Sequence, residues 1–172
     1  MCIRDSIRSF ENLKSFFKST EPEIVFHLAA QALVPKSYED PRYTFDTNIM
    51  GSVNVLDCTK VTKSVRSLIY VTSDKCYDNV EWVWGYREHD RLGGPDPYSA
   101  SKGSAELAVN SYIKSFFNEA TNLSLCSARA GHVIGGGDWS DDRIIPDCVK
   151  AWSKNQKVIL RNPYSTRPWQ HV

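Results

Sequence analysis

The residue types best suited to chemistry are a tyrosine and a lysine four positions apart, Tyr98 and Lys102, in the run Tyr-Ser-Ala-Ser-Lys. Residues at this spacing lie on one helical face, one turn apart. A lysine ammonium beside a phenol favours the phenolate. A phenolate can take a proton from an alcohol while a hydride leaves for a nicotinamide. The spacing alone is also common on solvent-exposed helix faces, so the motif needs support from its surroundings.

That support comes from the polar residues that follow an apolar run at 67–73. The run ends in Ser73, and Asp74 and Lys75 come next. Polar residues at the carboxyl end of a parallel strand lie where α/β sheets bind ligands. Ser73 could hydrogen-bond the same alcohol as Tyr98, or Ser73 and Asp74 could simply turn the chain. The helix with Tyr98 that follows favours a shared site.

Strands and helices must alternate to position these residues, and the hydrophobic pattern predicts that they do. Continuous apolar runs are typical of strands buried on both faces of a parallel sheet, and a 3.6-residue period indicates helices. Together they predict a doubly wound, Rossmann-like parallel α/β sheet. The pattern predicts strands at 24–28, 67–73, 123–129 and 157–161, helices at 6–19, 40–61, 98–120 and 144–152, and irregular chain at 76–97 and 131–142.

The expected nucleotide-binding fold is incomplete in this sequence. Such a domain normally opens with a strand, a glycine-rich turn and a helix, and no such turn precedes a helix here. The run Gly135-Gly136-Gly137 leads into Asp138-Trp139, so we interpret it as loop geometry. We expect residues 1–130 to form a partial nucleotide-binding domain without its first βαβ units, and residues 131–172 to begin a smaller substrate-binding region.

Composition limits the classes of function. The chain has 172 residues and a net charge of +1, which does not favour nucleic acid or an anionic membrane as partner. No apolar run approaches the roughly 20 residues that span a bilayer. Its five cysteines include no CxxC pair, so neither a metal site nor a disulfide framework is indicated. We therefore expect a cytoplasmic protein.

The motifs resemble those of the short-chain dehydrogenase/reductase superfamily. A strand ending in Ser73 and followed by Tyr98 and Lys102 is typical of it. The segments 27–31 and 47–51 resemble its extended members. Within the superfamily, the finer resemblance is to the CDP-glucose 4,6-dehydratases and covers nearly the whole chain. It is carried by residues 72–77, 82–88, 92–103, 128–131, 134–139, 142–147 and 167–172.

The resemblance implies a role for each catalytic residue. Tyr98 would be the base at the sugar 4-hydroxyl, Ser73 would orient that hydroxyl, and Lys102 would hold the nicotinamide ribose. Asp74 would be the acid that protonates the departing 6-hydroxyl. Lys75 would act at C5, either as a base or as a cation that stabilises an enolate. The implied reaction turns CDP-glucose into CDP-4-keto-6-deoxyglucose, a lyase step in deoxysugar biosynthesis, as for O-antigen.

The same resemblance implies the binding residues and partners. NAD is the implied cofactor, inferred from the family because the segment that distinguishes NAD from NADP lies upstream. A homo-oligomer is expected for the full-length protein. Besides Tyr98 and Lys102, the implied cofactor contacts are Leu28, Ala29, Ala30 and Gln31, and the implied substrate contacts are Asn48, His132, Arg143 and Arg167.

Two residues depart from the family pattern, in addition to the missing glycine-rich turn. Cys2 stands where relatives have an aspartate that contacts adenine, and His132 replaces an asparagine that faces substrate and cofactor. The alternatives are another sugar-nucleotide 4-epimerase or dehydratase, or a non-catalytic fragment. An epimerase needs only the tyrosine base and a rotating keto sugar, so Asp74 and Lys75 discriminate between the enzymes.

Overall fold

The computed structural model describes residues 6–117 and 122–172. These residues form two compact units, with the boundary between Arg129 and Ala130. The first unit contains the three-stranded sheet and the helix that carries both Tyr98 and Lys102. Each unit is described by itself below.

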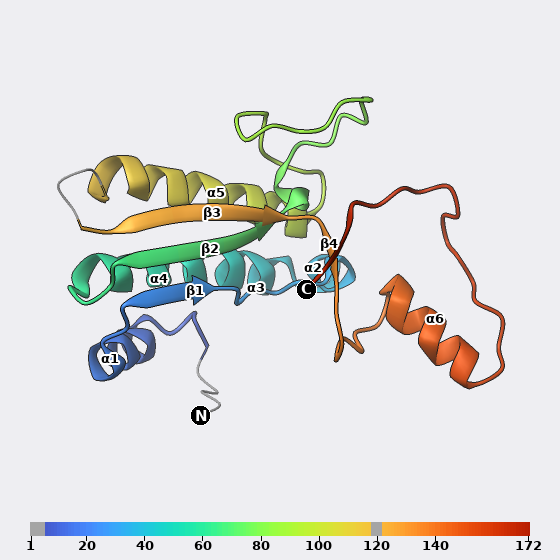
Figure 1. Cartoon of the computed structure of the whole chain (residues 1–172), viewed down its shortest axis with the longest axis horizontal. Coiled ribbons are helices and arrows are strands. Elements are labelled where there is room, and N and C mark those ends of the chain that lie inside the picture. Colours follow the sequence, from blue (N-terminus) through green and yellow to red (C-terminus); the bar gives the residue numbers. More distant parts are fainter. Residues whose placement is uncertain (1–5, 118–121) are drawn as a thin grey trace. The chain divides into compact units, whose positions relative to one another are not determined.

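The first unit is built on a three-stranded sheet in the order β1-β2-β3. The strands are β1 (Ile24–His27), β2 (Ser67–Ser73) and β3 (Ser124–Ala130). Strands β1 and β2 pair in parallel, with His27 opposite Tyr70. The three arrows point the same way in Figure 1. The parallel α/β sheet predicted from the sequence is therefore confirmed, and all three carboxyl ends lie at one edge.

The core of this unit lies between one face of the sheet and three helices. These are α1 (Phe10–Thr20), α4 (Gly51–Val61) and α5 (Pro97–Phe116). Alternate residues of β2 are buried against them, as the two-residue period of a strand requires. The buried apolar side chains from all these elements include Phe17, Val55, Leu56, Leu68, Tyr70, Ala105 and Val109.

The opposite face of the sheet differs from the expectation. The apolar run predicts that β1 is buried on both faces, but Ile24 and Phe26 are 54% and 65% exposed. Apolar side chains on both sides of a strand are typical of a sheet with a helical layer on each face. Among the described residues, the helices of the core cover only the face that carries His27 and Tyr70.

A long helical stretch follows β1 and contains one irregular turn. It begins with α2 (Val34–Glu39), which the sequence pattern does not predict. Asp40 then caps α3 (Pro41–Phe45) by accepting a hydrogen bond from the Tyr43 backbone N–H at 2.9 Å. A π-helical turn, η1 (Asp46–Met50), joins α3 to α4. The predicted helix over 40–61 is thus present, with a π-turn inside it.

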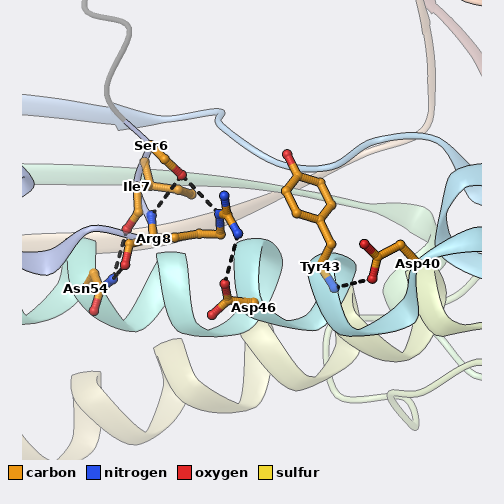
Figure 2. Close-up of polar contacts among 7 residues, drawn as sticks. All are labelled: Ser6, Ile7, Arg8, Asp40, Tyr43, Asp46 and Asn54. Atoms are coloured by element: carbon orange, nitrogen blue, oxygen red, sulfur yellow. Dashed lines mark hydrogen bonds and ion pairs between the residues drawn. The ribbon is translucent and has the colours of Figure 1, made fainter.

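The segment before α1 is a turn at residues 6–9, closed by the Ser9 backbone N–H on the Ser6 carbonyl at 3.0 Å, and it packs against this helical stretch. The sequence predicts a helix from residue 6. Figure 2 shows Arg8 paired with Asp46 at 3.3 Å, and Asn54 donating to the Ile7 carbonyl at 2.9 Å. A Cβ at position 51 would lie only 2.5 Å from the Ile7 side chain, which is too close for a contact. Glycine at position 51 therefore allows the turn at residues 6–9 to pack closely against the helix.

The second unit contains β4 (His132–Ile134), α6 (Ile144–Ser153) and β5 (Trp169–His171). Strands β4 and β5 pair in parallel, with His132 opposite Trp169. The helix predicted over 144–152 is present. The strand predicted at 157–161 is wrong, because that segment has no strand structure, and residues 132–134, predicted as loop, are a strand.

The bounds of β2 and the start of α5 agree closely with the sequence prediction. Strand β2 has the predicted bounds, and α5 begins one residue before the predicted start. Residues 118–120 of the predicted last turn of that helix lie outside the described residues, as does Cys2. No helix in the described part of the chain is long and apolar enough to cross a membrane.

Candidate active site

The first half of the site is a tight turn at the carboxyl end of β2. The strand ends at Ser73, and a 3₁₀ turn, η2 (Asp74–Cys76), follows. The Ser73 hydroxyl donates to Asp74 Oδ1 at 3.0 Å and accepts from the Lys75 backbone N–H at 3.2 Å. The serine hydroxyl thus holds the aspartate carboxylate at the strand end, while the Lys75 side chain is exposed.

The second half of the site is the first turn of α5. Asp96 caps this helix by accepting from the Ser99 backbone N–H at 2.9 Å and from the Ser99 hydroxyl at 2.6 Å. Pro97 follows at the first helical position, where its missing N–H costs nothing. This cap fixes Tyr98 in the first turn. Lys102 lies one turn along, and both side chains are buried.

A close backbone approach brings the two halves together. Helix α5 packs on the η2 turn at Gly103. A Cβ at position 103 would lie 3.0 Å from the Gly93 nitrogen and 3.2 Å from the Cys76 carbonyl oxygen. Those two atoms are hydrogen-bonded to each other at 2.8 Å. Only a residue without a side chain fits here without displacing that bond.

The charge of Lys102 is balanced inside the protein. Burial lowers the pKa of Lys102, and the negative charge of Glu106, one turn further along α5, opposes that effect. Burial alone would raise the pKa of Glu106, but hydrogen bonds from Arg129, Thr72 and Ser127 lower it overall. Glu106 is therefore an ionised partner held next to the lysine.

A buried polar cluster under the site was not predicted from the sequence. His27 Nε2 lies 3.2 Å from the Ser52 hydroxyl, which also lies 2.7 Å from the Tyr70 hydroxyl. Burial and the charge of Lys102 lower the pKa of His27 to about 4. Burial raises the pKa of Tyr70 to about 12. The cluster is thus neutral at neutral pH. The sequence feature that could have pointed to the cluster is His27, a histidine at the end of an apolar run.

Asn48, expected at the substrate, has a different place in the structure. It is 2% exposed. Its Oδ1 accepts from the Gln31 backbone N–H at 2.8 Å, and its Nδ2 donates to the Gln31 carbonyl at 3.0 Å and to the Ser101 hydroxyl at 2.8 Å. The π-turn η1 places it there. In this structure the Asn48 side chain ties the segment after β1 to α5.

The residues expected at the cofactor divide into two groups. Leu28 and Ala29 are exposed at the carboxyl end of β1, and Ala30 is half-buried. Gln31 is buried, and its side chain is used within the protein: Nε2 donates to Thr44 and to the Leu33 carbonyl, both at 3.0 Å. The backbone at 28–30 and its small side chains therefore remain open, while the Gln31 side chain is occupied.

The three remaining substrate candidates belong to the second unit. The ring of His132 packs edge-on against Trp169, with ring centroids 5.1 Å apart. Arg143 precedes α6, and its Nε lies 3.4 Å from an Asp138 carboxylate oxygen. Arg167 is exposed and donates to the Thr166 carbonyl. No group of three metal-ligating side chains occurs among the residues that the structure describes.

A parallel sheet with a Ser-Asp-Lys turn and a capped Tyr-x-x-x-Lys helix at its carboxyl edge defines an α/β protein of the short-chain dehydrogenase class. The family model for GDP-mannose 4,6 dehydratase matches residues 2–172. The chain belongs to this family.

Individual relatives agree with the family match. A CDP-glucose 4,6-dehydratase of Salmonella typhimurium is 55% identical over 170 residues, which cover 96% of this chain and 47% of that protein. A dTDP-D-glucose 4,6-dehydratase of Dictyostelium discoideum is 30% identical over 167 residues, 91% of this chain and 37% of that protein. The chain therefore spans about half the length, or less, of these curated relatives.

Solved structures share the fold. A UDP-glucose 4-epimerase of Thermus thermophilus, in complex with NAD, superposes with a TM-score of 0.83 at 26% identity, covering 98% of this chain and 55% of that one. A dTDP-glucose 4,6-dehydratase of Streptomyces venezuelae, with NAD bound, gives a TM-score of 0.84 at 20% identity, covering 98% and 50%. The Rossmann-like parallel α/β fold class predicted from the sequence is confirmed.

Proposed function

We propose that the full-length protein is a CDP-glucose 4,6-dehydratase, a lyase that converts CDP-glucose into CDP-4-keto-6-deoxyglucose. The observation that carries the proposal is the packing of the Ser73–Asp74–Lys75 turn against the Tyr98–Lys102 helix. This arrangement offers an acid and a base at one strand edge. The 55% identity to the Salmonella dehydratase supports the same substrate.

NAD fits the residues at this edge as cofactor. The exposed Leu28 and Ala29 at the end of β1 leave the backbone accessible where α/β sheets bind ligands. Lys102, buried beside Tyr98 on the same helix, would hold the nicotinamide ribose. When bound, NAD accepts the hydride from the sugar and returns it. The NAD in the Thermus epimerase structure supports this assignment.

The residues of this chain supply the proton chemistry. In the proposal Tyr98 takes the proton of the sugar 4-hydroxyl, and the Lys102 ammonium favours the phenolate that does so. Ser73 orients that hydroxyl. Oxidation at C4 makes the C5 proton acidic, and Lys75 acts there as base or as cation. Asp74 in its protonated form gives its proton to the departing 6-hydroxyl, which leaves as water, and the contact with Ser73 holds the carboxyl group in place.

The wider setting is also part of the proposal. The first unit would hold NAD, and the second would begin the substrate region, where Arg143 and Arg167 are suited to a diphosphate. We propose a cytoplasmic homo-oligomer; free thiols at the four described cysteines fit a reducing compartment. A role in O-antigen deoxysugars would agree with a relative named CDP-paratose 2-epimerase, from Salmonella typhi, 26% identical over 129 residues.

One competing function has specific support. The Thermus UDP-glucose 4-epimerase shares the fold at 26% identity, and an epimerase also needs a base such as Tyr98. Such an enzyme would have no use for an acid at the departing 6-hydroxyl. Asp74, held at the site by Ser73, therefore favours the dehydratase.

Product analysis tests the proposal. The full-length protein with NAD is incubated separately with CDP-, dTDP-, UDP- and GDP-linked hexoses, and products are read by mass spectrometry. We expect loss of one water from CDP-glucose in preference to the other sugar nucleotides. A product of unchanged mass that is inverted at C4 would instead identify an epimerase.

A further inference from the structure

The segment 77–92 leaves the catalytic turn, extends past the sheet, and returns just before α5 (Figure 1). Its backbone is irregular, yet its side chains are ordered around one ring. Tyr86 stacks on Tyr77 with ring centroids 5.0 Å apart and contacts Trp82 at 5.5 Å. The Tyr86 hydroxyl donates to Asn79 Oδ1 and accepts from the Val80 backbone N–H, both at 2.8 Å. We call this segment the catalytic loop extension.

The outgoing and returning arms of the extension are bonded to each other where the segment begins and ends, at residues 77–78 and 91–92. The Asp78 backbone N–H donates to the Arg91 carbonyl at 3.0 Å, and the Arg91 side chain lies 3.3 Å from the Asp78 carboxylate. Tyr77 and Leu92 form an isolated antiparallel bridge. The start of the extension is also bonded to the η2 turn: the Tyr77 backbone N–H donates to the Asp74 carbonyl at 3.2 Å and closes that turn.

One guanidinium group holds both arms. Arg129, at the end of β3, donates from Nη1 to the Tyr77 hydroxyl at 2.8 Å and to the Glu88 carbonyl at 2.9 Å. Its guanidinium carbon also lies 4.8 Å from the centre of the Tyr77 ring. Tyr77 belongs to the outgoing arm and Glu88 to the returning arm, so one guanidinium nitrogen bridges the two arms.

The fork itself is anchored from the opposite side. Arg129 Nη2 lies 3.0 Å from Glu106 Oε2, and the Glu106 side chain is 4% exposed. Glu106 also accepts from Ser127 at 3.0 Å and from Thr72. Helix α5, β2 and β3 therefore all contribute to fixing the arginine. The Arg129 side chain is 16% exposed, and a largely buried ion pair with these additional hydrogen bonds has little freedom to shift.

We propose that Arg129 is a positioning residue that fixes the catalytic loop extension and, through Tyr77, the turn bearing Asp74 and Lys75. Its role in turnover rests on the proposed function. Its role in fixing the extension rests on the geometry alone. A buried Arg–Glu pair could instead only stabilise the fold, in which case its loss would loosen the whole unit and not the extension in particular.

Hydrogen exchange of the full-length protein tests the structural part of the proposal. Tyr77→Phe removes the hydroxyl that accepts from Arg129 and leaves the Arg129–Glu106 pair intact. Tyr112→Phe is the matched control, because it also removes one hydroxyl bond, 2.9 Å long, to Asp57 between α5 and α4. We expect amides in residues 77–92 to exchange about tenfold faster in Tyr77→Phe, as loss of one charge-assisted hydrogen bond implies. The control should leave them unchanged. Unchanged exchange in Tyr77→Phe overturns the proposal.

Kinetics with CDP-glucose test the functional part. Arg129→Lys keeps the charge but has a single nitrogen, so it cannot hold both arms through one nitrogen and Glu106 through a second, as the guanidinium does. We expect kcat to fall about tenfold or more, with KM changed less than about threefold, because misplaced catalytic groups slow the chemical step. A rise in KM at constant kcat overturns the proposal.

Two controls keep the outcomes separate. If Arg129→Lys loses protection throughout α4 and α5, its fold is affected, and the exchange and kcat of Tyr77→Phe decide instead. The exchange measurement needs no substrate. A wild-type protein that does not convert CDP-glucose would therefore refute the proposed function while leaving the anchoring of residues 77–92 to be judged on its own data.

Discussion

At the scale of single residues, the site is a set of side chains held by bonds to one another before any ligand binds. The Ser73 hydroxyl holds the Asp74 carboxylate at 3.0 Å. The ionised Glu106 lies one turn from Lys102, whose pKa is lowered by burial. Fixed groups of this kind contribute to rate because they need not reorganise during the reaction.

Tyr98→Phe tests the assigned base. The substitution removes one hydroxyl from a buried ring, so the fold should persist, while kcat with CDP-glucose should fall at least about 100-fold, the usual contribution of general base catalysis. Tyr38→Phe, at a side chain that is 65% exposed, is the control and should keep its activity. Steady-state kinetics and circular dichroism measure both properties. Near-wild-type turnover in Tyr98→Phe would show that the base is a different residue.

Asp74→Asn separates the two chemical steps. Only the departing 6-hydroxyl needs a proton from Asp74, so elimination should slow about 100-fold while oxidation at C4 changes little. Stopped-flow absorbance should then show reduced nicotinamide accumulating on the enzyme. Equal slowing of both steps would make Asp74 a structural residue.

At the scale of elements, the sequence predicts regular structure well and irregular turns poorly. Strand β2 and helices α5 and α6 follow from the local hydrophobic pattern. The π-turn η1 does not, because it depends on bonds from Asn48 to distant Gln31 and Ser101. For the same reason the sequence motif gives no sign that the Asn48 side chain is bonded to Gln31 and Ser101.

The contact at Gly103 is a test of how the elements meet. Gly103→Ala places a Cβ against hydrogen-bonded backbone atoms that cannot easily move. The strain should outweigh the better helix propensity of alanine and lower the free energy of unfolding by about 1 kcal/mol. Gly85→Ala is the control, since no atom lies within 4 Å of its Cβ, and should change it by less than about 0.5 kcal/mol. Urea denaturation measures both. Equal stability of the two variants would contradict this packing.

The buried His27 predicts a pH dependence of stability. Its pKa in the folded protein is lowered to about 4 from the ordinary value of 6.5. The unfolded chain therefore binds the proton first, so stability is complete above pH 6.5 and falls as the pH drops towards 4. Between about pH 7.5 and about pH 5.5 the loss due to His27 should be about 1 kcal/mol.

The contribution of His27 is read as a difference between two proteins. Urea denaturation of wild type and His27→Asn is compared across this pH range, because carboxylates titrate in both. The loss should be smaller in the variant. Parallel curves for the two proteins would mean that His27 is not kept neutral by the fold.

At the scale of the whole molecule, the sequence predicts the α/β class, and the described chain shows why some details differ. The apolar runs around Ile24 and Phe26 predict burial on both faces, but burial depends on what packs against a strand, which no local pattern contains. The chain spans about half of its relatives' length. The Tyr98–Lys102 motif can be found from sequence because its spacing is local, whereas the His27 cluster and Arg129 depend on contacts across the fold.

The transfer of hydride within one sugar molecule tests the central claim most directly. Full-length protein with NAD is given CDP-glucose carrying deuterium at C4, and the product is analysed by NMR and mass spectrometry. We predict deuterium at C6 of a 4-keto-6-deoxy sugar, a solvent proton at C5, and no net release of reduced cofactor. Product that keeps its 6-hydroxyl and is inverted at C4, or one reduced cofactor released per sugar, would contradict the account.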